Sequence, residues 1–190
     1  VEIINPAPVG GSSGQIFLDV SCPNILVDAS VVNGNFSAGQ IVSGMATETG
    51  STGDPVFSSS GLPSSVNMAA NGAAGGSIDT IGVFNLMISV LDQYGCSGAS
   101  FTTMNITCQT DITIKPNLNM TIPAGSPVNG NAVARNCIGS KTYSATGLPT
   151  GVTIDSNTGN YSGSPTVTGT YFPNVKVTDK NGCFAVDIDT

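Results

Sequence analysis

The side chains with the widest chemical repertoire in this 190-residue chain are its five cysteines: Cys22, Cys96, Cys108, Cys137 and Cys183. A cysteine thiolate can bind zinc or attack an electrophile, and two thiols can form a disulfide. The chain has no histidine and no C-x-x-C pair, so we do not expect a zinc site. The missing imidazole also counts against most nucleophilic and proton-transfer catalysis, and we expect neither an enzyme nor a cofactor. Disulfide bonds are therefore the favoured role, and they imply an oxidising, extracytoplasmic setting.

The carboxylates could serve two other kinds of chemistry. Asp92 and Asp179 stand where an expected strand enters a turn, in VLDQYGC and VTDKNGC, and Asp111 lies between them. They are weak candidates for calcium, which needs six to eight oxygen ligands, because no dense acidic cluster surrounds them. Acceptance of hydrogen bonds from turn amides is the favoured interpretation of Asp92 and Asp179. Asp187 and Asp189 share one face of the expected final strand and could form a glycosidase pair, but aspartates at a strand end usually just face water.

The overall charge is sparse and acidic. Twelve Asp plus Glu oppose five Lys plus Arg, which gives a net charge of −7, and only 9% of the residues are charged. A nucleic-acid partner is not expected from this balance. No apolar run approaches the roughly 18 residues of a membrane span, and any export signal would have been removed or would lie upstream. The composition is typical of an extracellular or cell-surface protein with an inert, hydroxyl-rich exterior.

The hydrophobic pattern predicts strands throughout. The convincing segments alternate with a period of two residues, and turn-forming residues such as GSTGDP, SNTG and KNG separate them closely. No stretch keeps a helical period. We therefore predict an all-β chain with a sandwich architecture. The clearest strands are expected at 15–21, 84–92, 101–107 and 173–179.

An internal repeat is the strongest signal in the sequence. Four blocks recur in the same order, three at a shift of 86 residues and the fourth at a shift of 87 after one inserted residue. Two tandem copies of one module of about 86 residues explain this order. The matching blocks are 20–22 with 106–108, 37–44 with 123–130, 57–66 with 143–152, and 81–96 with 168–183.

The second copy carries a recognisable set of motifs. Residues 143–183 read YSATGLPTGVTIDSNTGNYSGSPTVTGTYFPNVKVTDKNGC. This stretch resembles the putative immunoglobulin-like (PIG) repeats of bacterial surface proteins, with their GLP turn, "TG.YSG.P" hairpin and "V.VTD.NGC" ending. The first copy departs from the pattern at 67–82, NMAANGAAGGSIDTIG. The resemblance implies two tandem immunoglobulin-like β-sandwiches in a repeat-bearing extracellular protein, and it implies no catalytic activity.

The predicted domains follow from the repeat and the resemblance. Residues 1–22 are expected to be terminal strands of a preceding or neighbouring module, 23–108 the first immunoglobulin-like module, and 109–190 the second, whose last strand is short or incomplete. The GLP turn in both modules needs a glycine with positive φ, Gly61 in the first and Gly147 in the second.

Immunoglobulin-like topology indicates which cysteines meet. A cysteine in the linker before a module lies near the V-x-D-x-x-G-C loop of that module. This pairs Cys22 with Cys96 and Cys108 with Cys183, at separations of 74 and 75 residues. Cys96 cannot pair with Cys108, because the expected strand between them holds the two apart. Cys137 is left over, and a Cys137 to Cys183 bridge that leaves Cys108 free is the alternative.

The ends of the chain raise the question of partners. Residues 15–22, QIFLDVSC, align at the same shift of 86 with 101–108, FTTMNITC, the closing strand of the first module. Both ends therefore look incomplete. The chain could be a segment of a longer repeat protein, with neighbouring modules as partners, and this is the favoured explanation. Alternatively, the N-terminal strand could complete the sandwich of another copy, because an exposed edge strand invites such pairing.

Two classes of function remain. The favoured one is a structural module of an extracellular stalk, adhesin or filament, which acts as a stiff spacer pinned by disulfides. The alternative is a carbohydrate- or surface-binding module whose loops at one sandwich end hold a glycan, with Tyr94 and Tyr161 as the candidate ligand residues. The aromatic residues at repeat-equivalent positions are expected in the core: Phe57, Phe84, Tyr143 and Tyr171. Four N-x-S/T sequons are candidates for glycosylation: Asn35, Asn105, Asn119 and Asn160.

Overall fold

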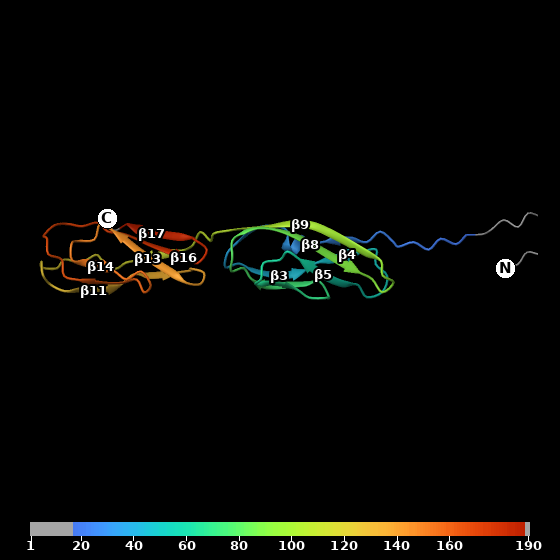
Figure 1. The fold of residues 1–190 in the computed structure, drawn as a ribbon, viewed down its shortest axis with the longest axis horizontal. Helices are drawn as coiled ribbons and strands as arrows, with labels where there is room; N and C mark the ends of the chain where they lie inside the picture. Colours follow the sequence, from blue (N-terminus) through green and yellow to red (C-terminus); the bar gives the residue numbers. More distant parts are fainter. Residues whose placement is uncertain (1–16, 189–190) are drawn as a thin grey trace, which may run out of the picture.

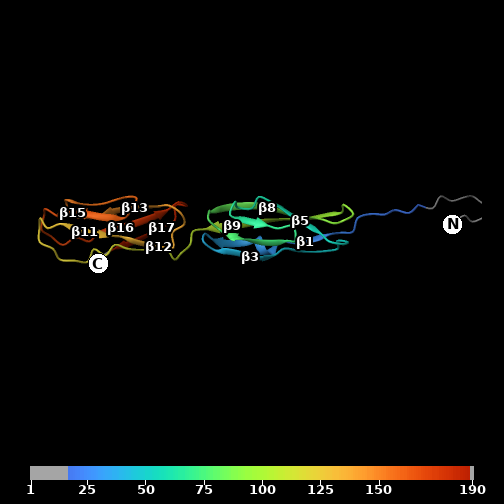
Figure 2. The ribbon, with the colours of Figure 1, turned by 90° about the horizontal axis from the view of Figure 1, so that it is seen from below.

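The computed structural model describes residues 17–188, and these residues form two β-sandwich modules. The modules lie end to end in both views (Figures 1 and 2), and the described N-terminal residues extend away from the first module. A short 3-10 turn, η1 (Ser30–Val32), is the only helical element of the described residues. The all-β prediction is therefore confirmed.

The first module contains β1 to β9. Its four-stranded sheet has the order β2-β9-β8-β5, its three-stranded sheet has the order β3-β7-β6, and β1 pairs with β4. β8 and β9 form one long antiparallel ladder, and β2 runs parallel to β9 on its other side. The bounds are β1 (Leu26–Asp28), β2 (Gly34–Ser37), β3 (Ile41–Met45), β4 (Thr47–Thr49), β5 (Val56–Ser60), β6 (Val66–Met68), β7 (Ala73–Ser77), β8 (Gly82–Leu91) and β9 (Ser97–Thr107).

The core of the first module lies between its two larger sheets. Val42 and Val66 come from the β3-β7-β6 sheet, whereas Ile88, Met104 and Ile106 come from the other sheet, and all of them are buried in one cluster. The alternation of the sequence puts these apolar side chains on the inner face of each strand.

The second module contains β10 to β17 and repeats this plan without a described counterpart of β2, and its β16 and β17 are shorter than β8 and β9. Its sheets have the orders β13-β16-β17, β11-β15-β14 and β10-β12. Val175 and Val177 of β16 are fully buried in its own core cluster. The bounds are β10 (Thr113–Lys115), β11 (Val128–Asn131), β12 (Val133–Arg135), β13 (Lys141–Thr146), β14 (Val152–Ile154), β15 (Asn160–Gly163), β16 (Asn174–Asp179) and β17 (Phe184–Ile188).

The predicted strands inside the two modules and the predicted GLP turns are present in the structure. The strands expected at 84–92, 101–107 and 173–179 correspond to β8, β9 and β16. The GLP glycines have the predicted positive φ, 82° at Gly61 and 75° at Gly147. At Gly61 a side chain would overlap the backbone carbonyl of Asn85, so a glycine is required there.

The prediction of a strand at 15–21 is wrong for residues 17–21, the part that the structure describes. Phe17 to Ser21 form no strand, and Gln15 and Ile16 lie outside the described residues. The alternation in this segment is real, but a strand needs a neighbour that supplies hydrogen bonds, and the described chain offers none at this place.

Candidate functional site at the module junction

One disulfide ties each linker segment to the module that follows it. The Sγ atoms of Cys22 and Cys96 are 2.08 Å apart and those of Cys108 and Cys183 are 1.99 Å apart. The structure thus brings together the two pairs that the immunoglobulin-like topology favoured, and it does not form the alternative Cys137 to Cys183 bridge. Because β9 runs from Ser97 to Thr107, Cys96 and Cys108 stand at opposite ends of one strand.

Cys137 is a free, partly buried thiol in the turn between β12 and β13. Burial raises the pKa of the Cys137 thiol, against the opposing effect of the Lys141 charge and with a further contribution from Asp179. A raised pKa lowers the thiolate fraction of Cys137, and the thiolate is the form that attacks a disulfide.

Each bridging loop is held by a buried aspartate. Asp92 Oδ1 accepts hydrogen bonds from the backbone N–H groups of Tyr94 and Cys96, both at 2.9 Å, and Oδ2 accepts one from Thr52 at 3.3 Å. Burial alone would raise the pKa of Asp92, but the amides of Cys96, Tyr94, Thr52 and Gly95 outweigh it and hold the pKa below its usual range. This is the predicted structural role, acceptance of turn amides.

Asp179 repeats the arrangement in the second module. Its Oδ1 accepts from Asn181 at 2.9 Å and from Cys183 at 3.1 Å, and its Oδ2 accepts from the N–H of Ile138 at 3.1 Å. Ile138 lies 86 residues after Thr52. Asp179 therefore holds together the same two loops in the second module that Asp92 holds together in the first, an arrangement called here the aspartate clamp. The clamp fixes the loop that carries Cys183 against the turn that carries Ile138.

Three further contacts cross the junction between the modules. The Ile138 side chain of the second module packs against the core cluster of the first. Lys180 Nζ lies 2.9 Å from Asp79 Oδ2, and Asn181 Nδ2 donates to the backbone carbonyl of Asp79 at 3.1 Å. Lys180 and Asn181 belong to the loop that Asp179 holds, so the clamp also positions the residues that reach across.

The linker itself is bonded to the second module. Asn136 Nδ2 donates to the backbone carbonyl of Asp111 at 3.0 Å and to its Oδ2 at 2.9 Å, and Gln109 Nε2 donates to the carbonyl of Asn136. The carboxylates of Asp92, Asp111 and Asp179 therefore all accept protein hydrogen bonds. Within residues 17–188, no three His, Cys, Asp or Glu side chains gather in a way that could hold a metal ion.

The two candidate ligand tyrosines differ in their exposure to solvent. Tyr94 is 72% exposed in the loop between β8 and β9. The prediction for Tyr161 is wrong, because its side chain is only 2% exposed and its hydroxyl donates to the carbonyl of Asn117 at 2.8 Å. The residue paired with Tyr161 across the sheet is Gly130, and the phenol ring fills the space that a side chain there would take. This pairing depends on the register between β11 and β15, which the sequence alone does not reveal.

The other candidate residues lie as follows. Phe57 and Tyr143 are buried as predicted, Phe84 is partly buried against the first core, and Tyr171 is only half-buried. Asp187 is half-buried on β17, and Asp189 lies outside the described residues.

The sequon asparagines lie on strands or beside a cavity. Asn105 Nδ2 donates to Asn35 Oδ1 at 2.9 Å across β9 and β2, and Asn160 Oδ1 accepts from Asn131 at 2.7 Å. Asn119 is exposed at the edge of a cavity in the second module.

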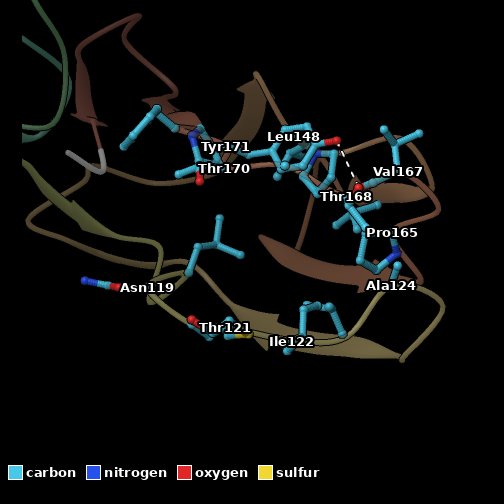
Figure 3. A pocket seen from close by; sticks show the side chains of 18 residues that line it. Asn119, Thr121, Ile122, Ala124, Leu148, Pro165, Val167, Thr168, Thr170 and Tyr171 are labelled. Atoms are coloured by element: carbon cyan, nitrogen blue, oxygen red, sulfur yellow. Dashed lines mark hydrogen bonds between the residues drawn. The ribbon is translucent and has the colours of Figure 1, made fainter.

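That cavity, of about 410 Å³, was not anticipated from the sequence. Residues 118–122 and Ala124 line one side, and Leu148, Pro165 and residues 167–173 line the other (Figure 3). Within this second wall the Tyr171 hydroxyl donates to the carbonyl of Val167 at 3.1 Å. The lining combines aliphatic and aromatic side chains with the polar side chains of Asn119, Thr121, Thr168 and Thr170.

No helix among the described residues is long and apolar enough to cross a membrane. The structural comparison finds extracellular cadherin repeats. Mouse cadherin-23 EC22-24 covers 87% of this chain and 63% of its own, with 14% identity and a TM-score of 0.38. The match to Drosophila N-cadherin EC1-3 covers 70% of this chain and 52% of the cadherin chain, with 16% identity and a TM-score of 0.38. At such scores the likeness carries no argument, and the fold assignment rests on the sheets themselves.

Two sequence comparisons are more direct. The chain is 28% identical over 176 residues to proteins named "Serine-rich adhesin for platelets" from Staphylococcus aureus, strains USA300 and MRSA252, a match that covers 91% of this chain. The chain spans only 8% and 13% of the length of these two relatives. Residues 110–188 match the family described as "Putative Ig domain". The second module therefore matches this immunoglobulin-like family, as the resemblance of its motifs predicted.

Proposed function

We propose that this chain is a structural module of an extracellular stalk, adhesin or filament, where it acts as a stiff spacer pinned by disulfides. The observation that carries the proposal is the junction, where a Cys108 to Cys183 bridge, the packing of Ile138 and the pair of Lys180 with Asp79 act together. The proposed modules are residues 23–108 and 109–190, with 1–22 as terminal strands of a preceding or neighbouring module. This role requires neither catalysis nor a cofactor.

The physical argument concerns bending. A single covalent linker would leave the two modules free to rotate about it, and interfaces between domains of one chain normally allow relative motion. Here the linker is bonded to the second module by Gln109 and Asn136, and the bridge ties its first residue to the far loop. The exposed ion pair adds little by itself and is screened by salt, so the bridge and the apolar contact of Ile138 supply most of the stiffness.

Two observations support an extracellular location. Disulfides persist in oxidising compartments, and the chain pairs four of its five cysteines. The similarity to proteins named as adhesins points to the same setting.

Distance measurements between spin labels test the spacer role. Labels carried by genetically encoded amino acids at the exposed positions Ser43 and Thr153 would report on the two modules without using cysteine chemistry. We expect one narrow distribution of distances in the wild-type chain and a broad one in Cys108→Ala/Cys183→Ala. The matched control is Cys22→Ala/Cys96→Ala, which removes the other bridge and should leave the distribution narrow. Equal widths in all three proteins would refute the role of the junction bridge.

A second candidate function is the binding of a carbohydrate or another surface through loops at one sandwich end. The exposed Tyr94 favours it, because a free aromatic face can stack on a sugar ring. A glycan array probed with the wild type and with Tyr94→Ala tests this function. Binding that depends on Tyr94 would support it, and the absence of any bound glycan would remove it.

A further inference from the structure

The two disulfides join segments far apart in the sequence into one short covalent path. From Cys22 this path crosses the first bridge directly to Cys96. It then follows β9 to Cys108, crosses the second bridge to Cys183, and enters β17. This route is called here the bridged path. It passes through both modules without following most of their chain.

The rest of each module forms a closed loop beside the bridged path. These bypassed loops are residues 23–95 and 109–182, and the bridges close them at separations of 74 and 75 residues. Most of the buried residues of the two cores belong to them. At about 3.6 Å per residue of stretched chain, each loop would release about 260 Å if its bridge were absent and its module unfolded.

The bridged path itself has almost no length to give. The Cα atoms of Cys22 and Cys96 are 5.4 Å apart, and those of Cys108 and Cys183 are 5.5 Å apart. The 11 residues of β9 between the two bridges are already extended. Because a strand rises about 3.3 Å per residue and a fully stretched chain about 3.6 Å, tension could lengthen this part by only about 4 Å.

The bridged path also runs along the long axis of the molecule. In Figure 1, β9 extends from the end of the first module that the N-terminal residues approach to the end from which the linker leaves, and β17 begins at the junction end of the second module. A pull along this axis acts on the covalent bonds of β9. It does not shear β9 from β8, because β8 belongs to a bypassed loop that bears none of the load.

The bridges are placed where one of the two cysteines is shielded. Cys96 and Cys183 are 7% and 2% exposed, and their backbone N–H groups are held by the carboxylates of Asp92 and Asp179. Attack on a disulfide requires access to one of its sulfur atoms, so each bridge offers a reductant little access on its buried side.

We propose that this chain bears tension, and that the pulling force passes from bridge to bridge along β9 while the folded bodies of both modules stay unloaded. Forced unfolding is governed by the unfolding rate, and a pull speeds unfolding only as far as unfolding lengthens the path on which the pull acts. With both bridges closed, unfolding of a bypassed loop lengthens nothing. The chain therefore keeps its length under loads that would unfold the same modules without their bridges.

This inference rests on the proposed structural role, because a stalk or filament that holds a surface is pulled along its axis. Its test is separate from the test of that role. The spin-label distances report on bending at rest, whereas the experiment below measures lengthening under load. A chain that bends freely could still resist extension, and a stiff chain could still unfold when pulled, so either proposal can fail alone.

Single-molecule force spectroscopy on the 190-residue chain tests the proposal, with handles fused to its two ends so that the free Cys137 is not used for attachment. The variants Cys22→Ala/Cys96→Ala and Cys108→Ala/Cys183→Ala should each lengthen in one step of about 260 Å, because each frees one bypassed loop. The wild type should show no step of this size at the loads that unfold these variants.

A second measurement keeps the test decisive where a variant folds poorly. A reductant added to the wild type under constant load should produce the same two steps, one for each bridge. The matched control is Cys137→Ala, which keeps both bridges and should stay as short as the wild type. A wild type that lengthens by about 260 Å in an oxidising buffer would overturn the proposal. So would double variants and reduced chains that stay as short as the oxidised wild type.

Discussion

Removal of the Cys108 to Cys183 bridge should destabilise the second module alone. The bridge closes a loop of 75 residues that starts in the linker and contains β10 to β16. In the chain-entropy description, opening a loop of this length releases about 15 cal/mol/K of denatured-state entropy, which is about 4.5 kcal/mol at 25 °C. Apart from Cys108 itself, this loop lies outside the first module.

The predicted change in melting temperature is large. In a domain of 60 to 100 residues, a loss of 1 kcal/mol lowers the melting temperature by roughly 4 to 8 °C. The variant Cys108→Ala/Cys183→Ala should therefore melt its second module about 20 °C or more below the wild type. Calorimetry should show two transitions, which must be fitted separately because a chain of two modules need not unfold in one step.

The other bridge provides the control. Cys22→Ala/Cys96→Ala opens a loop of 74 residues around the first module, so it should lower the other transition by a similar amount. The reasoning would be refuted if each double variant lowered both transitions equally, or if the second transition stayed within a few degrees of the wild type.

Three further predictions concern single contacts. Asp179→Ala should lower the free energy of unfolding of the second module by about 2 to 3 kcal/mol in urea titrations, because it leaves buried amides without an acceptor; an unchanged midpoint would contradict the clamp. The hydrogen bond from Lys180 holds the pKa of Asp79 below its usual range, so this pair should stabilise the junction above about pH 4 and stop doing so as pH falls through the lowered pKa; because the bridge and Ile138 remain, the spin-label distances should broaden only slightly there, and a profile identical to that of Lys180→Ala would argue otherwise. Gly130→Ala should cost about 1 to 3 kcal/mol in thermal unfolding, because the new methyl group overlaps the phenol of Tyr161, and a neutral result would count against that packing.

Much of the fold could be predicted because the information is local or repeated. Alternation with a period of two predicted β8, β9 and β16, and the GLP motif predicted positive φ at its glycines. The role of Asp92 as an acceptor for turn amides also followed from sequence, because the donors lie two and four residues further on. A local pattern determines such features, since the interacting groups are near each other before the chain folds.

The errors arose where a residue's environment depends on a distant strand. Tyr161 was a candidate ligand residue, yet Gly130 pairs with it across the sheet, and that register buries its ring. The segment after Gln15 has the alternation of a strand but lacks a described partner. Periodicity indicates which face of a segment is apolar, but it does not say what that face meets.

By itself, the sequence determined that the chain is all-β, that it contains one module twice, and that the linker cysteines recur at matching separations. Tertiary structure decided the rest. It brought Lys180 to Asp79 across 101 positions of the sequence, packed Ile138 of one module against the core of the other, and left a cavity beside Val128 and Val152. The physical reason is that these contacts depend on the register between strands and on the docking of one module against the next. Neither is encoded in the spacing of residues along a single segment.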